Sequence, residues 1–149
     1  MQVRLATESE LSDVFNLCKA LVHESPVFSK QPFNERTTTA FIQHQISKDG
    51  VLVALDEYQN IVGAAICAVY VDWRTGQRTA IEQGIYVLPE YRNTKAGILL
   101  VKGFQEWAVH NDAERIQIGT MSGIESERVV KLYERLGFTQ CGYVLDQEV

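Results

Sequence analysis

The sequence predicts an α+β fold, a layered α/β architecture in which helices flank a mixed, mostly antiparallel sheet. Four segments carry apolar residues at helical spacing, and three strand-like runs in the middle of the chain are joined by short polar turns. Further short strand-like runs lie near both ends of the chain. Together they give the order β-α-α-β-β-β-α-β-α-β in one domain over residues 1–149.

A strand and two helices are expected in the first third of the chain. The strand covers residues 2–6, and Thr7 followed by Glu10 has the spacing of a capping box that starts a helix. A second helix begins after Asn34, a good helix cap, and ends at Asp49-Gly50. Residues at helical spacing predict that one face of the first helix points to the core: Leu11, Val14, Phe15, Cys18, Leu21 and Val22.

An antiparallel meander is expected in the middle of the chain. Strands over residues 51–55 and 61–71 are separated by four polar residues, 57–60, which is typical of a β-hairpin. A second turn leads to a third strand over residues 79–88. Gly84 interrupts the apolar run of this strand and indicates a β-bulge, which would splay the strand from its neighbour.

Two helices and two strands are expected in the last third. A strongly apolar helix covers residues 95–110, and a short strand follows over residues 115–120. The next helix covers residues 126–136 and ends at Gly137, as a C-cap glycine would end it. A last strand, or two short ones, is expected over residues 138–145.

Composition and charge limit the classes of function. Of the 149 residues, 46% are hydrophobic and 22% charged, which fits one ordinary globular domain. The net charge of −5 argues against nucleic acid as a partner, because binding phosphates needs clustered Lys and Arg. The longest apolar run, Ile61–Val71, is too short to span a membrane, and the N-terminus lacks a signal-peptide pattern. Three widely spaced cysteines indicate neither disulfides nor a metal site, so a reducing cytoplasm is expected.

The segment over residues 84–100 is the most informative about chemistry. A strand ends before Pro89, a polar loop follows, and a helix begins at the small residues Ala96 and Gly97. The first N–H groups of a helix are unpaired, and the helix dipole adds positive potential there, so this turn can bind a phosphate or pyrophosphate. The alternative is an ordinary strand–loop–helix connection that binds nothing.

Two motifs in this part of the chain resemble the GNAT acetyltransferase family. The run Tyr86–Arg92 resembles the family's strand-to-loop signature, which precedes an Arg/Gln-x-x-Gly-x-Gly/Ala loop that holds the pyrophosphate of coenzyme A. Arg92 and Gly97 fill the first and last positions of that loop. Lys95 stands where the family usually has glycine, and Asn93 replaces another common glycine.

The second motif lies about forty residues downstream. Residues 126–138 resemble the family's Asn-x-x-Ala-x-x-Leu-Tyr-x-x-Leu-Gly-Phe helix, with Ser126 and Val129 in place of Asn and Ala. The resemblance extends over nearly the whole chain and implies acetyl-CoA as co-substrate and no metal. It also implies a set of cofactor-binding residues: Ile85, Val87, Arg92, Asn93, Thr94, Lys95, Ala96, Gly97, Ile98 and Ser126.

The resemblance implies two catalytic residues. The tyrosine that corresponds to Tyr133 lies near the thioester sulfur in the family and can protonate the departing thiolate; its ordinary pKa of about 10 resembles that of a thiol. Glu82 lies on the strand leading to Val87, where the family often has a catalytic carboxylate. Strand alternation puts Glu82 and Gln83 on opposite faces and leaves open which of them faces the pocket, and a water chain is the alternative base.

The expected function is the transfer of an acetyl group to a primary amine. The acceptor is a small molecule or a peptide, and its identity stays open among protein N-termini, lysines, polyamines, aminoglycosides and amino acids. The family is often dimeric, so the resemblance allows a homodimer. Two alternatives remain: a coenzyme A-binding module with little catalysis, and a purely structural protein of the same fold.

Overall fold

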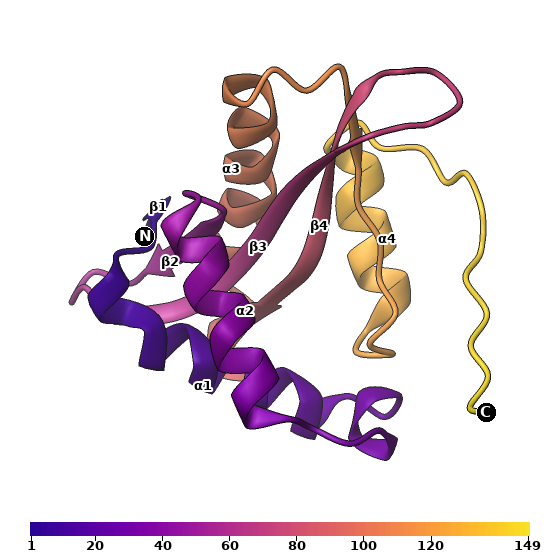
Figure 1. The fold of residues 1–149 in the computed structure, drawn as a ribbon. Helices are drawn as coiled ribbons and strands as arrows, with labels where there is room; N and C mark the ends of the chain where they lie inside the picture. The colour runs from indigo at the N-terminus through magenta and orange to yellow at the C-terminus, as the bar shows by residue number, and fades with distance from the viewer.

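The computed structural model describes all residues 1–149 and contains a five-stranded sheet (Figure 1). Strand order along the sheet follows the chain, and the first three strand pairs are antiparallel, whereas the last pair is parallel. This arrangement confirms the predicted α+β class with a mixed, mostly antiparallel sheet. The strands are β1 (Gln2–Leu5), β2 (Val51–Leu55), β3 (Ile61–Val71), β4 (Arg78–Val87) and β5 (Arg115–Gln117).

Four helices flank this sheet: α1 (Leu11–Glu24), α2 (Glu35–Ser47), α3 (Ala96–His110) and α4 (Ser126–Arg135). Three short 3-10 turns accompany them: η1 (Glu8–Glu10), η2 (Phe28–Lys30) and η3 (Pro89–Tyr91). Helices α1 and α2 cover one face of the sheet and α3 covers the other (Figure 1). None of the helices combines the length and the apolar character that crossing a membrane requires.

Strand β2 is buried on both sides, which explains its continuous apolar sequence. Val51 and Val53 pack against α1 and α2, whereas Leu52 and Ala54 belong to the core under α3. Side chains of consecutive strand residues point to opposite faces, so a central strand between two helical layers has no polar face.

The predicted helix ends are confirmed where a cap specifies them. The Glu10 carboxylate accepts a hydrogen bond from the Thr7 N–H at 3.0 Å, as in a capping box. Asn34 Oδ1 accepts from the N–H of Thr37 at 2.8 Å at the start of α2. Gly137 follows α4 with φ of 102°, a left-handed conformation that glycine adopts without steric cost.

Two strand predictions for the last third were wrong in extent. Residues 138–145 form no strand, and the segment after Phe138 extends past α4 away from the sheet (Figure 1). Strand β5 stops at Gln117 rather than at residue 120, because its neighbour β4 diverges from it. In both cases the missing requirement is a neighbouring strand to pair with, which strand-like composition does not supply.

Candidate functional site

A β-bulge in β4 shapes the site. Ile66 pairs with Gly84 and Cys67 pairs with Glu82, so Gln83 is the extra residue. The bulge that Gly84 indicated is therefore present, one position before the glycine. It also settles which residue faces the cavity: Glu82 and Gln83 both line it, because a bulge interrupts the alternation of strand faces.

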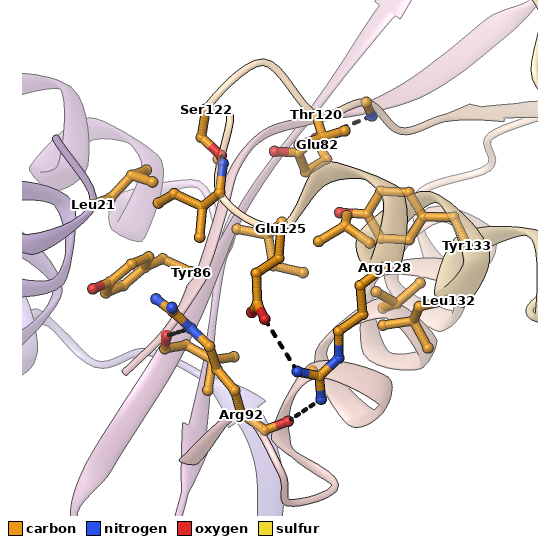
Figure 2. A pocket seen from close by; sticks show the side chains of 18 of the residues that line it. Leu21, Glu82, Tyr86, Arg92, Thr120, Ser122, Glu125, Arg128, Leu132 and Tyr133 are labelled. Atoms are coloured by element: carbon orange, nitrogen blue, oxygen red, sulfur yellow. Dashed lines mark hydrogen bonds and ion pairs between the residues drawn. The ribbon is translucent and has the colours of Figure 1, made fainter. Parts of the chain in front are cut away.

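Strands β4 and β5 pair only over their first residues, Thr79–Ile81 with Arg115–Gln117. Beyond these pairs a cavity of about 560 Å³ lies between them, bounded by β4, the start of α3, residues 119–125 and α4. Figure 2 shows its lining side chains. A cavity of this size matches the clefts that hold small organic ligands.

The start of α3 presents unpaired N–H groups to this cavity. The first intrahelical bond runs from the N–H of Leu99 to the carbonyl of Lys95, so the N–H groups of Gly97 and Ile98 have no acceptor in the protein. Thr94 Oγ1 accepts from the N–H of Ala96 at 3.2 Å. Two free donors at the positive end of a 15-residue helix favour an anion.

The Arg92 side chain points away from these donors. Its guanidinium donates two hydrogen bonds of 2.6 Å to the Glu24 carboxylate, and its Nε donates to the carbonyl of Val87 at 3.0 Å. It also lies over the Tyr86 ring, 5.4 Å from the centroid. The bonds from Arg92 are the largest cause of the lowered pKa of Glu24. Arg92 thus ties the turn before α3 to the end of α1.

Arg128 on α4 lies nearer to the start of α3. Its guanidinium donates to the carbonyl of Arg92 at 3.3 Å and to Asn93 Oδ1 at 3.2 Å, and it forms an ion pair of 3.4 Å with Glu125 (Figure 2). The Arg128 side chain keeps 56% of its surface exposed. Exposure and weak pairing leave this cation able to meet an anion at the cavity.

Glu82 and Tyr133 lie together at the other end of the cavity in Figure 2. Loss of hydration on burial raises the pKa of Glu82 to about 7, although the N–H of Gly119 donates weakly to Glu82 Oε2 at 3.4 Å. Tyr133 is 6% exposed, and burial followed by the charge of Glu82 raises the pKa of its hydroxyl. The site therefore pairs a carboxyl that titrates near neutrality with a phenol that stays protonated.

Most of the site residues expected from the sequence meet at this cavity. The residues that line it are Glu82, Ile85, Val87, Arg92, Asn93, Thr94, Gly97, Ile98 and Tyr133. Three others do not. The Lys95 side chain is exposed, Ala96 is fully buried in the core under α3, and Ser126 lines a separate polar hollow beside α4.

Sequence reasoning missed several residues that line the cavity, among them Tyr86, Glu125 and Arg128. It also missed the wall formed by residues 119–122. No local pattern marks them. Each becomes part of the site because β4 and β5 separate and α4 packs beside the opening.

Comparison with known proteins places these features in a family. The family model described as "Acetyltransferase (GNAT) family" matches residues 16–138. No protein in the curated set matches the sequence. Among solved structures, the aminoglycoside N-acetyltransferase AAC(6')-Iy, in complex with a bisubstrate analogue, is similar with a TM-score of 0.77 and 19% identity, over 99% of this chain and 97% of that one.

Two further structures show the same fold. An acetyltransferase from Trypanosoma brucei has a TM-score of 0.71 and 21% identity over 99% of both chains. A ribosomal-protein-alanine N-acetyltransferase from Brucella melitensis biovar Abortus 2308 has a TM-score of 0.70 and 17% identity, over 99% of this chain and 100% of that one.

The fold and the cavity define an α+β protein with a ligand-sized opening between two separating strands. The family match spans residues 16–138, which is most of the chain. The protein belongs to the GNAT acetyltransferase family.

Proposed function

We propose that this protein is an N-acetyltransferase that uses acetyl-CoA to acetylate a primary amine. One observation carries the proposal: the unpaired start of α3 and the Glu82–Tyr133 pair open onto the same cavity. The first feature suits an anionic group and the second suits proton transfer, which are the two tasks of this reaction. Membership of the GNAT family supports the same reading.

The residues of the cavity fit acetyl-CoA. The N–H groups of Gly97 and Ile98, with Arg128 beside them, would hold the pyrophosphate. Past Ile81, β4 has no strand partner on its β5 side, so the main chain at Ile85 and Val87 would pair with the pantetheine arm as an added strand does. Bound there, acetyl-CoA supplies an acetyl group activated as a thioester.

Glu82 is the proposed general base. A carboxyl with a pKa of about 7 is half ionised at neutral pH and accepts a proton more readily than an ordinary glutamate. Its Oε atoms would take the proton that the amine must lose to attack the acetyl carbonyl. Burial, the cause of its raised pKa, also keeps bulk water from competing for this role.

Tyr133 is the proposed general acid, whose hydroxyl would protonate the departing sulfur. Its raised pKa keeps the proton in place at neutral pH, and the charge of Glu82 is one of the two causes. When Glu82 takes up a proton its charge disappears, so that cause is removed at the moment when Tyr133 must act. The order of proton transfers is thereby coupled: base first, acid second.

The acceptor that we propose is a small-molecule or peptide amine. AAC(6')-Iy and another structural neighbour are aminoglycoside acetyltransferases, which supports a small-molecule amine as the first class to test. We place the reaction in a reducing cytoplasm, because all three cysteines are free thiols.

The decisive experiment pairs two measurements on the full chain. Calorimetric titration with acetyl-CoA measures binding, and a thiol-release assay over a panel of aminoglycosides, polyamines, amino acids and N-terminal peptides measures turnover. Binding with turnover of at least one amine supports the proposal. Binding without any turnover favours a coenzyme A-binding module, and no binding leaves only the fold.

A further inference from the structure

The C-terminal segment, residues 139–149, is a strand without a partner. Its residues form no helix or strand and make no hydrogen bond with the rest of the protein. Tyr143, Val144 and Leu145 are 91%, 71% and 91% exposed. Consecutive large apolar side chains that are exposed to this extent, on an extended backbone, indicate a surface that is covered by something else.

The direction in which this segment leaves the domain is fixed. The Gln105 side chain donates to the carbonyl of Leu136 at 2.9 Å, which ties the end of α4 to α3. The Phe138 ring packs edge-on against Tyr133, with 6.2 Å between the ring centroids. Between them Gly137 turns the chain with a positive φ. The segment then runs past α4, which lies between it and β5 in Figure 1.

The sheet has an unpaired edge of matching length. Strand β5 is the last strand of the sheet and pairs only with β4. Residues 115–121, from the start of β5 to the wall of the cavity, span about 23 Å at roughly 3.3 Å per residue, and residues 139–145 span the same length. An edge of this kind is a template for a strand from another chain.

We propose that two copies of this chain exchange their C-terminal segments, so that residues 139–145 of each copy add a strand to the β5 edge of the other. The occupant is a second copy because one chain carries both the unpaired strand and the unpaired edge, and its segment points away from its own edge. Reciprocal exchange satisfies both at once and closes as a two-fold symmetric dimer.

The exchanged strand would become part of the cavity wall. Gly119, Thr120 and Met121 line the cavity, and the N–H of Gly119 is the donor to Glu82. In a single chain nothing pairs with the outer edge of β5. The partner's segment would brace this wall from outside, so the dimer would hold the environment of Glu82 more firmly than the monomer.

Sedimentation analysis of the full chain tests the exchange. The wild type should sediment as a dimer, and Val144→Pro should shift it to the monomer mass of 16.8 kDa, because proline removes a main-chain donor from the added strand. Gln147→Pro is the matched control: it lies in the same unanchored segment but beyond the paired residues, and should stay dimeric. A monomeric wild type, or a dimer that survives Val144→Pro, overturns the proposal.

Cross-linking separates exchange from pairing within one chain. Cys141 is exposed, and Arg115→Cys places a second thiol on β5. A short bismaleimide should join two full chains in Arg115→Cys far more often than in the wild type or in Lys48→Cys, a control on the exposed end of α2. Cross-links confined within single chains, or no increase over the controls, would contradict an exchange between copies.

Discussion

The Glu24 carboxylate and the Arg92 guanidinium form two hydrogen bonds of 2.6 Å, and they join segments that lie 68 residues apart in the sequence. The side chains are 31% and 19% exposed, so solvent weakens this pair without removing it. Through it the end of α1 holds the turn whose next residues begin α3. The pair thus supports the proposed cofactor site from outside the cavity.

Glu24→Gln should therefore weaken acetyl-CoA binding and lower the free energy of unfolding by about 1 kcal/mol at pH 7, the scale of a partly exposed charged hydrogen bond. Arg92 lowers the pKa of Glu24, so the stability that Glu24 contributes is present above its ordinary pKa and is lost as the pH falls through the lowered value. Urea titrations at pH 7 and in acid measure this. Glu57→Gln, at an exposed turn residue, should change neither quantity.

The pH dependence of turnover should report Glu82. Because the base must be ionised, kcat/KM should rise with pH with a midpoint near the pKa of about 7 and level off above it. Glu82→Gln should lose this rise and lower kcat/KM at pH 8 by roughly 10²–10⁴-fold, the usual contribution of a general base. Glu90→Gln, on the exposed turn before α3, is the control. A rise that persists in Glu82→Gln would assign the base to another group.

The same carboxyl makes a prediction about stability that does not depend on catalysis. Its pKa lies near 7 in the folded protein and at 4.5 ordinarily, so the folded state retains a proton that the unfolded state releases between these values. Stability therefore falls as the pH rises through this window. Glu82→Gln should melt above the wild type at pH 8, by about 2–4 °C per kcal/mol gained, and with it at pH 5. Calorimetry at both pH values is the measurement; equal melting at pH 8 would mean that Glu82 is well hydrated.

Tyr133→Phe should separate chemistry from binding. Phenylalanine keeps the ring that packs against Phe138 and removes the hydroxyl that would protonate the sulfur. We expect kcat to fall by about 10²-fold or more while the dissociation constant of acetyl-CoA changes little. Tyr58→Phe, at a tyrosine that is 78% exposed, should leave both unchanged. Turnover that survives in Tyr133→Phe would remove this residue from the acid role.

The fold was predictable where local chemistry specifies an element. Asn34 and Gly137 act at helix ends, and Gly84 marks the bulge, because capping and bulging depend on residues close in sequence. The closing strand over residues 138–145 could not be predicted correctly, since the pattern of a strand says nothing about where its partner lies. In this chain the segment extends alone.

The site was predictable only along its own motifs. Glu82, Gly97 and Tyr133 line one cavity as the family motifs implied. The motif also drew attention to Arg92, yet its side chain contacts Glu24 rather than the start of α3. Arg128 takes the place beside that turn. Such exchanges between cations depend on how α4 packs against the turn, and no spacing in the sequence encodes that packing.

Gly97 gives the sharpest test of the proposed pyrophosphate site, because a side chain there leaves the protein undisturbed. A Cβ atom at Gly97 would meet only Leu132 Cδ2, at 3.9 Å, which is an ordinary contact. Gly97→Ala should stabilise the protein by about 0.5–1 kcal/mol through its higher helix propensity. Gly97→Glu adds an anion in the first turn of α3, where the helix dipole favours it, so this variant should also fold normally.

For acetyl-CoA the two variants should differ. The glutamate would repel a pyrophosphate at the N–H groups of Gly97 and Ile98, so titration calorimetry should detect no binding to Gly97→Glu. Gly97→Gln has the same shape without the charge and should retain part of the affinity, which separates repulsion from steric exclusion. Because thermal melting shows independently that each variant is folded, unchanged affinity in Gly97→Glu would mean that the phosphates lie elsewhere.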